Sequence, residues 1–284
     1  MKKCLAIALA LLLCLSLGSA AAFAEEPAGY VAVSVDANVL GAGVLYGPVL
    51  IPFYAGESCA DVTQRFLGSN CEVDTSWGFY LTGIVLPRDF TPDVPAVLSA
   101  HAGTLGEGHS QAGETLQGFD FTATSGWFYT VNNEDMGVGV DTVPAEDGDV
   151  LRWQFSLIDW GADLGLAWDG NNVFTPEDKT ALVLAVAKLN SSADKAALLG
   201  DTAVKAAYDA AYDVLANLAV PEIAIRSVLV ELNSAVANVG DTPSTLLGSW
   251  HAKLPGWMKW TEKLWPGFQY AILFALFGWI WFLF

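Results

Sequence analysis

Residues 30–67 read YVAVSVDANVLGAGVLYGPVLIPFYAGESCADVTQRFL, and this stretch decides the fold of the first half of the chain. Valines alternate through residues 31–35, as one buried face of a strand requires, and residues 43–53 form a second apolar, β-branched run. Ser58 is expected to cap a helix, because its hydroxyl can accept from backbone amides and Asp61 follows three residues later. The order strand, strand, helix predicts an α+β module.

Three later strands complete this module. Strand patterns cover residues 77–86, 126–131 and 150–157, and the turn at Gly148 precedes the last of them. Together they predict an α+β fold whose N-terminal module, residues 25–165, is β-grasp-like. This module contains twenty Asp and Glu residues against three Arg, so its formal charge is −17.

The composition of the whole chain excludes two classes of protein. With 53% hydrophobic and 15% charged residues, the chain is too apolar for general disorder. With 31 Asp and Glu against 13 Lys and Arg, its formal net charge is −18. Binding to a phosphate backbone requires clustered cations, so we expect no nucleic-acid partner.

A small helical module is predicted over residues 176–238, after a linker at 166–175. Thr175 and Pro176 indicate the helix start, because a hydroxyl can cap the first turn and proline needs no amide partner there. Two further helices each have one apolar stripe. Helices of this length are marginal alone, so we expect a three-helix bundle.

The first 24 residues have the pattern of a secretory signal peptide. Lys2 and Lys3 precede an uncharged apolar run, and Ala22-Phe23-Ala24 has the small residues of a cleavage site. We expect cleavage after Ala24 and export of the chain.

The last eighteen residues, 267–284, read GFQYAILFALFGWIWFLF and contain no charge. A helix of this length measures roughly 27 Å, which is close to the hydrocarbon thickness of a bilayer. The preceding stretch, 239–266, is a linker and a collar rich in Trp and Lys, as membrane interfaces are. We expect a C-terminal transmembrane or membrane-interface helix; a buried C-terminal helix is the alternative.

Two cysteines remain after the predicted cleavage, Cys59 and Cys71. Thiols oxidise outside the cell, so the pair predicts a disulfide. A zinc site is excluded by the absence of nearby histidine and of a CxxC spacing.

Aromatic and amide residues in the strands are the candidate ligand-binding residues. They are Trp77, Tyr80, Trp127, Tyr129, Asn132, Asn133 and Trp153. The rings could form a platform for a flat ligand or a glycan, and the amides could donate and accept hydrogen bonds. The competing interpretation is that the rings are core and that Asn132 and Asn133 form a turn.

Four motifs carry a resemblance to a known family. They are GESCADV (56–62), WGFYLTGI (77–84), SGWFYTVNN (125–133) and DGDVLRWQFS (147–156), followed by DWGADLG (159–165). Residues 28–165 thus resemble a bacterial family of unknown function related to the C-terminal β-domain of transcobalamin and intrinsic factor. The resemblance implies a cobalamin-like ligand, although the chain has no room for the helical domain of those proteins. Residues 208–236 also resemble helical repeats of bacterial surface proteins.

Few residues have the pattern of a catalytic or metal-binding site. His101 and His109 could bind a metal with Glu107, but solvated side chains are the simpler interpretation. Acidic residues between Asp159 and Asp178 could bind calcium, although their spacing is not that of an EF-hand. We therefore expect no catalytic residue and no cofactor, and the metal question stays open.

The predicted function follows from these observations. We expect an exported, membrane-anchored protein at the extracellular face of the cell membrane, whose β-module binds a small molecule such as a corrinoid, or a glycan, without catalysis. One alternative is a substrate-capturing accessory subunit of a transporter, with a polytopic membrane partner. The other is a secreted enzyme of unknown reaction.

Overall fold

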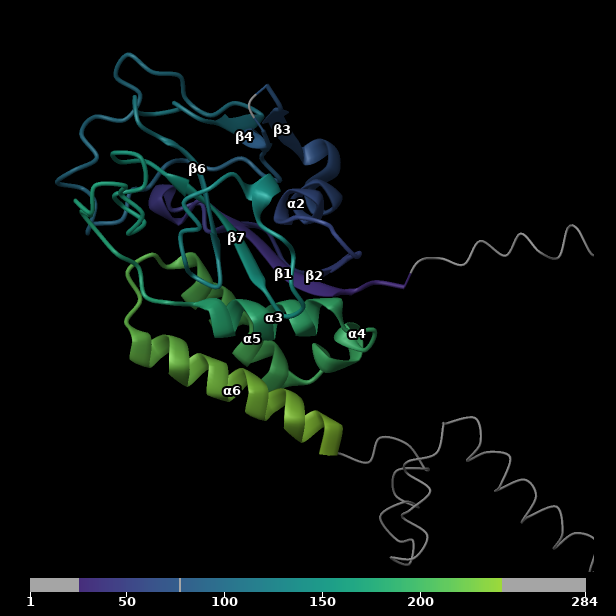
Figure 1. Ribbon diagram of the computed structural model, residues 1–284. Coiled ribbons are helices and arrows are strands. Elements are labelled where there is room, and N and C mark those ends of the chain that lie inside the picture. The colour runs from purple at the N-terminus through teal and green to yellow at the C-terminus, as the bar shows by residue number, and fades with distance from the viewer. Residues whose placement is uncertain (1–25, 77, 242–284) are drawn as a thin grey trace, which may run out of the picture. The chain divides into compact units, whose positions relative to one another are not determined.

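The computed structural model describes residues 26–76 and 78–241 (Figure 1). The chain divides into two compact units, residues 1–233 and 234–284. Apart from residues 234–241, all of the structure that follows belongs to the first unit. The predicted signal peptide and collar lie outside the described residues.

A mixed four-stranded sheet forms the centre of the first unit, with strand order β2-β1-β7-β6. β1 (Gly29–Asp36) pairs antiparallel with β2 (Val44–Phe53) and parallel with β7 (Val150–Ser156). β6 (Gly126–Val131) pairs antiparallel with β7. These strands match the predicted runs. Because β1 and β7 are both central, both of their faces are covered, and every residue of β7 is buried.

A second, antiparallel sheet has the order β3-β4-β5. β4 (Tyr80–Val85) is the core of the run predicted at 77–86. β3 (Cys71–Asp74) and β5 (Thr115–Gln117) were not predicted, because four and three residues are too few for an alternating pattern to be read. Three short 3₁₀ helices join these parts, and they are η1 (Asn38–Leu40), η2 (Gly68–Asn70) and η3 (Val140–Thr142).

Helix α2 (Cys59–Leu67) begins where the sequence predicted. Ser58 Oγ accepts from the Asp61 amide at 3.3 Å, and Asp61 Oδ2 accepts from the Ser58 amide at 2.8 Å. This reciprocal capping box satisfies amides that have no partner inside the helix. Val62 and Leu67 on the inner face of α2 are buried.

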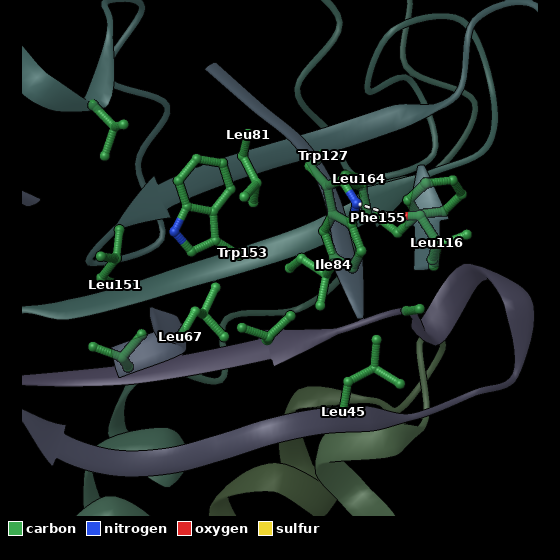
Figure 2. Packing of buried hydrophobic residues seen from close by; sticks show 14 of the residues in the cluster. Leu45, Leu67, Leu81, Ile84, Leu116, Trp127, Leu151, Trp153, Phe155 and Leu164 are labelled. Carbon is green, nitrogen blue, oxygen red and sulfur yellow. Dashed lines mark hydrogen bonds between the residues drawn. The ribbon is translucent and has the colours of Figure 1, made fainter. Parts of the chain in front are cut away.

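The apolar core lies between one face of the large sheet, α2 and the small sheet. It includes Val33 of β1, Ile84 of β4 and Phe155 of β7, all of them fully buried. Figure 2 shows the indoles of Trp127 and Trp153 among the leucines of this core. Phe155 and Trp127 contact edge to face at 5.2 Å.

Helices lie on the opposite side of the large sheet, with α3 and α5 in contact with its strands (Figure 1). They are α3 (Thr180–Ser191), α4 (Lys195–Leu198), α5 (Thr202–Ala216) and α6 (Glu222–Asp241). α3 packs on β2 and β1, with Leu182 and Val186 fully buried. Asn190 of α3 donates to the Pro48 carbonyl of β2 at 2.7 Å.

The first of these helices starts later than predicted. It begins at Thr180, whereas the sequence predicted a start at Thr175 and Pro176. The physical reason is Lys179, which is 2% exposed and donates to carbonyls at the end of α5. This tertiary contact outweighs the local capping signal of residues 175–178.

The fold class needs one correction, which concerns the membrane anchor. Within residues 26–76 and 78–241, no helix is long and apolar enough to cross a bilayer. The longest helix, α6, contains Glu222, Arg226 and Glu231 and is therefore amphipathic. The expected anchor at 267–284 lies outside the described residues, and the structure does not support it. What is found is an α+β fold with two sheets and, in the described part, five α-helices.

The predicted disulfide is wrong, because Cys59 and Cys71 are both free. Cys59 is the first residue of α2, and Cys71 follows the end of that helix. Nine helical residues span about 13 Å, which exceeds the roughly 7 Å between Cα atoms that a disulfide permits. The thiols also have separate partners, since Cys59 Sγ lies 3.9 Å from the Pro144 carbonyl and Cys71 Sγ lies 3.5 Å from that of Gly68.

Candidate functional site

Two of the predicted ligand-binding rings are core residues. Trp127 is 6% exposed and donates from Nε1 to the Leu116 carbonyl at 2.9 Å (Figure 2). Trp153 is 3% exposed and donates from Nε1 to Thr63 Oγ1 at 3.0 Å. Because both indoles are buried with their N–H groups satisfied, neither is available to a ligand in this conformation.

The remaining predicted residues do not form one platform. Tyr129 is half-buried, packs 5.4 Å from Trp153, and donates to the Val138 carbonyl at 2.6 Å. Burial raises its pKa to about 12. Tyr80 is exposed on β4, and Trp77 lies outside the described residues.

The two predicted asparagines form the turn after β6. Asn132 and Asn133 have φ values of +52° and +66°, in the left-handed region that Asn tolerates. The Asn132 side chain donates to Asp149 Oδ1 at 2.7 Å and accepts from the Val150 amide at 3.0 Å. Its amide therefore anchors this turn to the start of β7.

An exposed pair of aromatic rings was not singled out from the sequence. Phe119 is 50% exposed and Trp160 is 42% exposed, yet their rings lie 5.7 Å apart with an interplanar angle of 81°. We call these two residues the aromatic pair. What distinguishes these two exposed rings is their mutual contact, which places apolar surface from two rings side by side in solvent.

The backbone of the aromatic pair is strained. Phe119 has φ +67° and Trp160 has φ +55°, and the neighbouring Phe121 and Asp159 are also positive. For bulky residues, this left-handed conformation costs on the order of 1–3 kcal/mol each, and it persists only where surrounding contacts enforce it. Four strained residues at one place indicate that the ring positions are held.

Hydrogen bonds fix both halves of the aromatic pair to one short segment. The Phe119 amide donates to the Ser125 carbonyl at 2.9 Å, and the Trp160 amide donates to the Thr124 carbonyl at 3.3 Å. Thr124 Oγ1 also accepts from the Asp159 amide at 2.9 Å. The two rings are therefore oriented by the same few residues before β6.

The buried carboxylate of Asp120 keeps this turn in shape. Asp120 is 3% exposed, and it accepts from Ser110 Oγ at 2.5 Å and from the Gln117 amide at 2.8 Å. Its carbonyl accepts from Ser125 Oγ at 2.5 Å. Since the turn is tied on both sides, a ligand would meet Phe119 in a preorganised position.

Phe121 of the same turn forms part of the wall of a cavity of about 200 Å³. The remaining wall comes from the segment that joins β4 to β5. These residues are Leu86, Asp89, Phe90, Pro92, Gln111, Ala112 and Gly113. The cavity is small beside typical ligand pockets, which occupy about 300–1,000 Å³.

Asp159 directly precedes Trp160 in the chain. Its side chain is exposed, and within the described chain its carboxylate has no hydrogen-bond donor. A free carboxylate can accept hydroxyl hydrogens, and aromatic rings can cover apolar C–H surface. The arrangement can thus orient a ligand with polar edges and apolar faces.

The predicted metal sites are not assembled in the described part of the chain. No group of three or more His, Cys, Asp or Glu residues there is placed to hold a metal ion. Asp163 is buried and accepts from Ser156 Oγ at 2.6 Å and from the Leu157 amide at 2.7 Å. Its burial raises the pKa of the carboxyl group. Asp169 instead accepts from Asn171 at the following turn.

Comparison of the chain with protein-family models, curated proteins and solved structures found no match. The resemblance to the transcobalamin-related family therefore stays an expectation, and the assignment of a function depends on the geometry.

The aromatic pair had a partial signal in the sequence. Trp160 lies within DWGADLG, where Gly161 follows it, and Phe119 lies between Gly118 and Asp120. Large rings beside glycines and acids in loops are candidates for exposure. Their contact could not be predicted, because forty residues of chain separate the two rings.

Proposed function

We propose that this protein is an exported, non-catalytic binding module that holds a glycan against the aromatic pair. The observation that carries the proposal is the exposure of Phe119 and Trp160 on a strained, hydrogen-bonded backbone. The export part rests on the signal-peptide pattern of residues 1–24.

A sugar ring suits this surface because it has apolar C–H faces and hydroxyl edges. Stacking on Trp160 would bury apolar area, and Asp159 would accept from a hydroxyl. Because the two rings are already fixed, the protein loses little conformational entropy when a ligand binds. The charge of −17 on residues 25–165 disfavours an anionic glycan, so we propose a neutral or cationic one.

The proposal is tested with the full-length chain against a panel of neutral, amino and acidic oligosaccharides, with cyanocobalamin as a separate arm. Binding is followed by isothermal titration calorimetry. We expect Trp160→Ala and Phe119→Ala each to weaken glycan binding about tenfold, which corresponds to about 1.4 kcal/mol. Trp168→Ala is the matched control, because Trp168 is 87% exposed and lies outside the pair.

Two results would overturn the proposal. One is glycan binding that survives both substitutions. The other is binding of cyanocobalamin alone, which would favour the corrinoid expected from the family resemblance.

A further inference from the structure

A layer of buried polar side chains lies on the helix-covered face of the large sheet. Asp36, Asn38 and Lys179 are each 2% exposed, and Arg152 is 4% exposed. Arg152 Nη2 donates to Asp36 Oδ2 at 2.9 Å. The layer therefore buries two cations with one carboxylate, although a charge removed from water is costly unless it is paired.

Lys179 and Asn38 share one acceptor in this layer. Lys179 Nζ donates to the Leu215 carbonyl at 3.2 Å, and Asn38 Nδ2 donates to the same oxygen at 2.9 Å. Lys179 Nζ also donates to the Asn217 carbonyl at 2.6 Å. The amine of Lys179 and the side-chain amide of Asn38 are thus neighbours around a single oxygen atom, in a space closed to water.

Two atoms in the layer lack hydrogen-bond partners among the described residues, and they are Asn38 Oδ1 and Arg152 Nε. A buried polar atom without a partner costs about 1–3 kcal/mol. The carboxamide of Asn38 is therefore bound through its nitrogen alone, and its carbonyl oxygen has nothing to stabilise it in the present arrangement.

The amine of Lys179 is also set up to lose its proton. Desolvation, together with the nearby Arg152 guanidinium, lowers the pKa of Lys179 to about 8, although Asp36 acts in the opposite direction. A neutral amine is a nucleophile, and an amine with this pKa is partly neutral close to physiological pH.

We propose that Lys179 and Asn38 join in an intramolecular amide cross-link. The neutral Nζ attacks Cγ of Asn38, the Nζ–Cγ bond forms, and the Cγ–Nδ2 bond breaks. The proton that Nζ releases passes to the neighbouring Nδ2, which leaves as ammonia. One neutral amine and one primary amide become one secondary amide and one ammonia molecule, so atoms and charge balance without a co-reactant.

The cross-link has a physical advantage in this layer. It removes the positive charge of Lys179 from the interior and leaves Arg152 and Asp36 as a neutral pair. It also joins the start of η1 to the residue that precedes α3. The closed loop has about 140 residues, and it constrains the unfolded state as a disulfide does. Both described cysteines are free, so no such bond arises from them.

The test is mass spectrometry of the folded full-length chain after denaturation. Loss of ammonia lowers the mass by about 17 Da. We expect a proteolytic peptide that contains Lys179 covalently joined to the one that contains Asn38. The Lys179→Met and Asn38→Ala variants should each have the mass calculated from the sequence, with no loss of ammonia. Lys188→Met is the matched control, because Lys188 is an exposed lysine of the same helix. This variant should still show the mass decrease that corresponds to the loss of ammonia.

The peptide map of the wild-type protein decides the matter even if a variant fails to fold. The folded protein is held at about pH 8, which is close to the pKa of the amine, before it is digested. Recovery of the Lys179 peptide and the Asn38 peptide as separate, unlinked peptides would overturn the proposal. The readout does not depend on any ligand, so this result is distinct from failure of the glycan proposal.

Discussion

The buried polar atoms of the two core indoles each have one partner. Trp153 Nε1 donates to Thr63 Oγ1, which in turn donates to the Cys59 carbonyl at 2.8 Å. This chain ties β7 to the first turn of α2. Such contacts explain why Trp153 serves packing, since a ring that turned outward would leave its N–H and the Thr63 hydroxyl without these bonds.

The thiol of Cys59 should make stability depend on alkaline pH. Burial, together with the Asp149 carboxylate, raises its pKa from the ordinary value of 9.0 to about 12. Between these two values the unfolded thiol has lost its proton and the native thiol keeps it. The unfolded state then binds fewer protons, so the free energy of unfolding falls by about 1.4 kcal/mol per pH unit as pH rises. The contribution of the buried thiol to the free energy of unfolding is fully present below the pKa that the thiol has in the unfolded state.

This dependence can be measured by urea unfolding of the wild-type protein and of Cys59→Ala. We expect the variant to lose stability less steeply between about pH 9 and pH 11, because it has no thiol to ionise. Tyrosines are present in both proteins and largely cancel in the comparison; the exception is Tyr129, whose raised pKa depends in part on Cys59. Parallel pH profiles would show that the native thiol ionises as freely as the unfolded one.

At the scale of elements, local signals and tertiary contacts compete. α2 begins at its capping box, where Ser58 and Asp61 form hydrogen bonds with each other. α3 does not begin at Pro176, because Lys179 is drawn to the end of α5. A helix start is thus predictable where its capping residues face solvent, and it shifts where a side chain of the first turn is buried.

The capping box gives a prediction about α2. Ser58→Ala removes the acceptor for the Asp61 amide, and we expect the free energy of unfolding to fall by about 1 kcal/mol. The hydrogen bonds from Ser58 also lower the pKa of Asp61, so the effect should shrink as pH falls and Asp61 is protonated. Ser99→Ala is the control, because its hydroxyl makes only a 3.4 Å contact outside any helix. Equal urea midpoints for the two variants would contradict the role of the cap.

For the first compact unit, the central question is whether sheet and helices form one cooperative structure. α3 packs on β1 and β2, and Tyr212 of α5 donates to the Gly47 carbonyl at 3.0 Å. A Cβ at Gly47 would lie 2.4 Å from the Val33 carbonyl, and its φ is +74°, so glycine is required there. The helical residues therefore share an interior with the sheet.

This shared interior predicts a single unfolding transition. Leu182→Ala in α3 should lower the free energy of unfolding by about 2–5 kcal/mol, because Leu182 is fully buried. Far-ultraviolet circular dichroism follows the helices. Six of the eleven tryptophans lie at 250–281, so the β-rich part is followed by the fluorescence difference between otherwise identical proteins with and without Trp153→Phe. Both midpoints should shift together, while the exposed Lys188→Ala leaves them unchanged. A shift of the dichroism transition alone would show that the helices unfold independently.

The sequence by itself determined the main strands, the start of α2 and the turns at Gly148 and Asn132, because each depends on neighbours in the chain. Alternating valines predicted β1 whatever lay beside it, and both turns have the left-handed residues that were expected. The tertiary structure alone decided that Trp127 and Trp153 are buried. Alternation shows that two faces exist, but in a central strand such as β7 both faces are covered.

Pairings across long stretches of chain were likewise decided by the tertiary structure. Phe119 meets Trp160, Arg152 meets Asp36, and Lys179 meets Asn38 only after the sheet and the helices have packed. Cys59 and Cys71 also stay apart in the folded chain, because Cys59 begins α2 and Cys71 follows the end of that helix. A local sequence pattern predicts the structure of residues within a few positions of one another. A functional site joins residues that are far apart in the sequence, and only the folded chain brings them into contact.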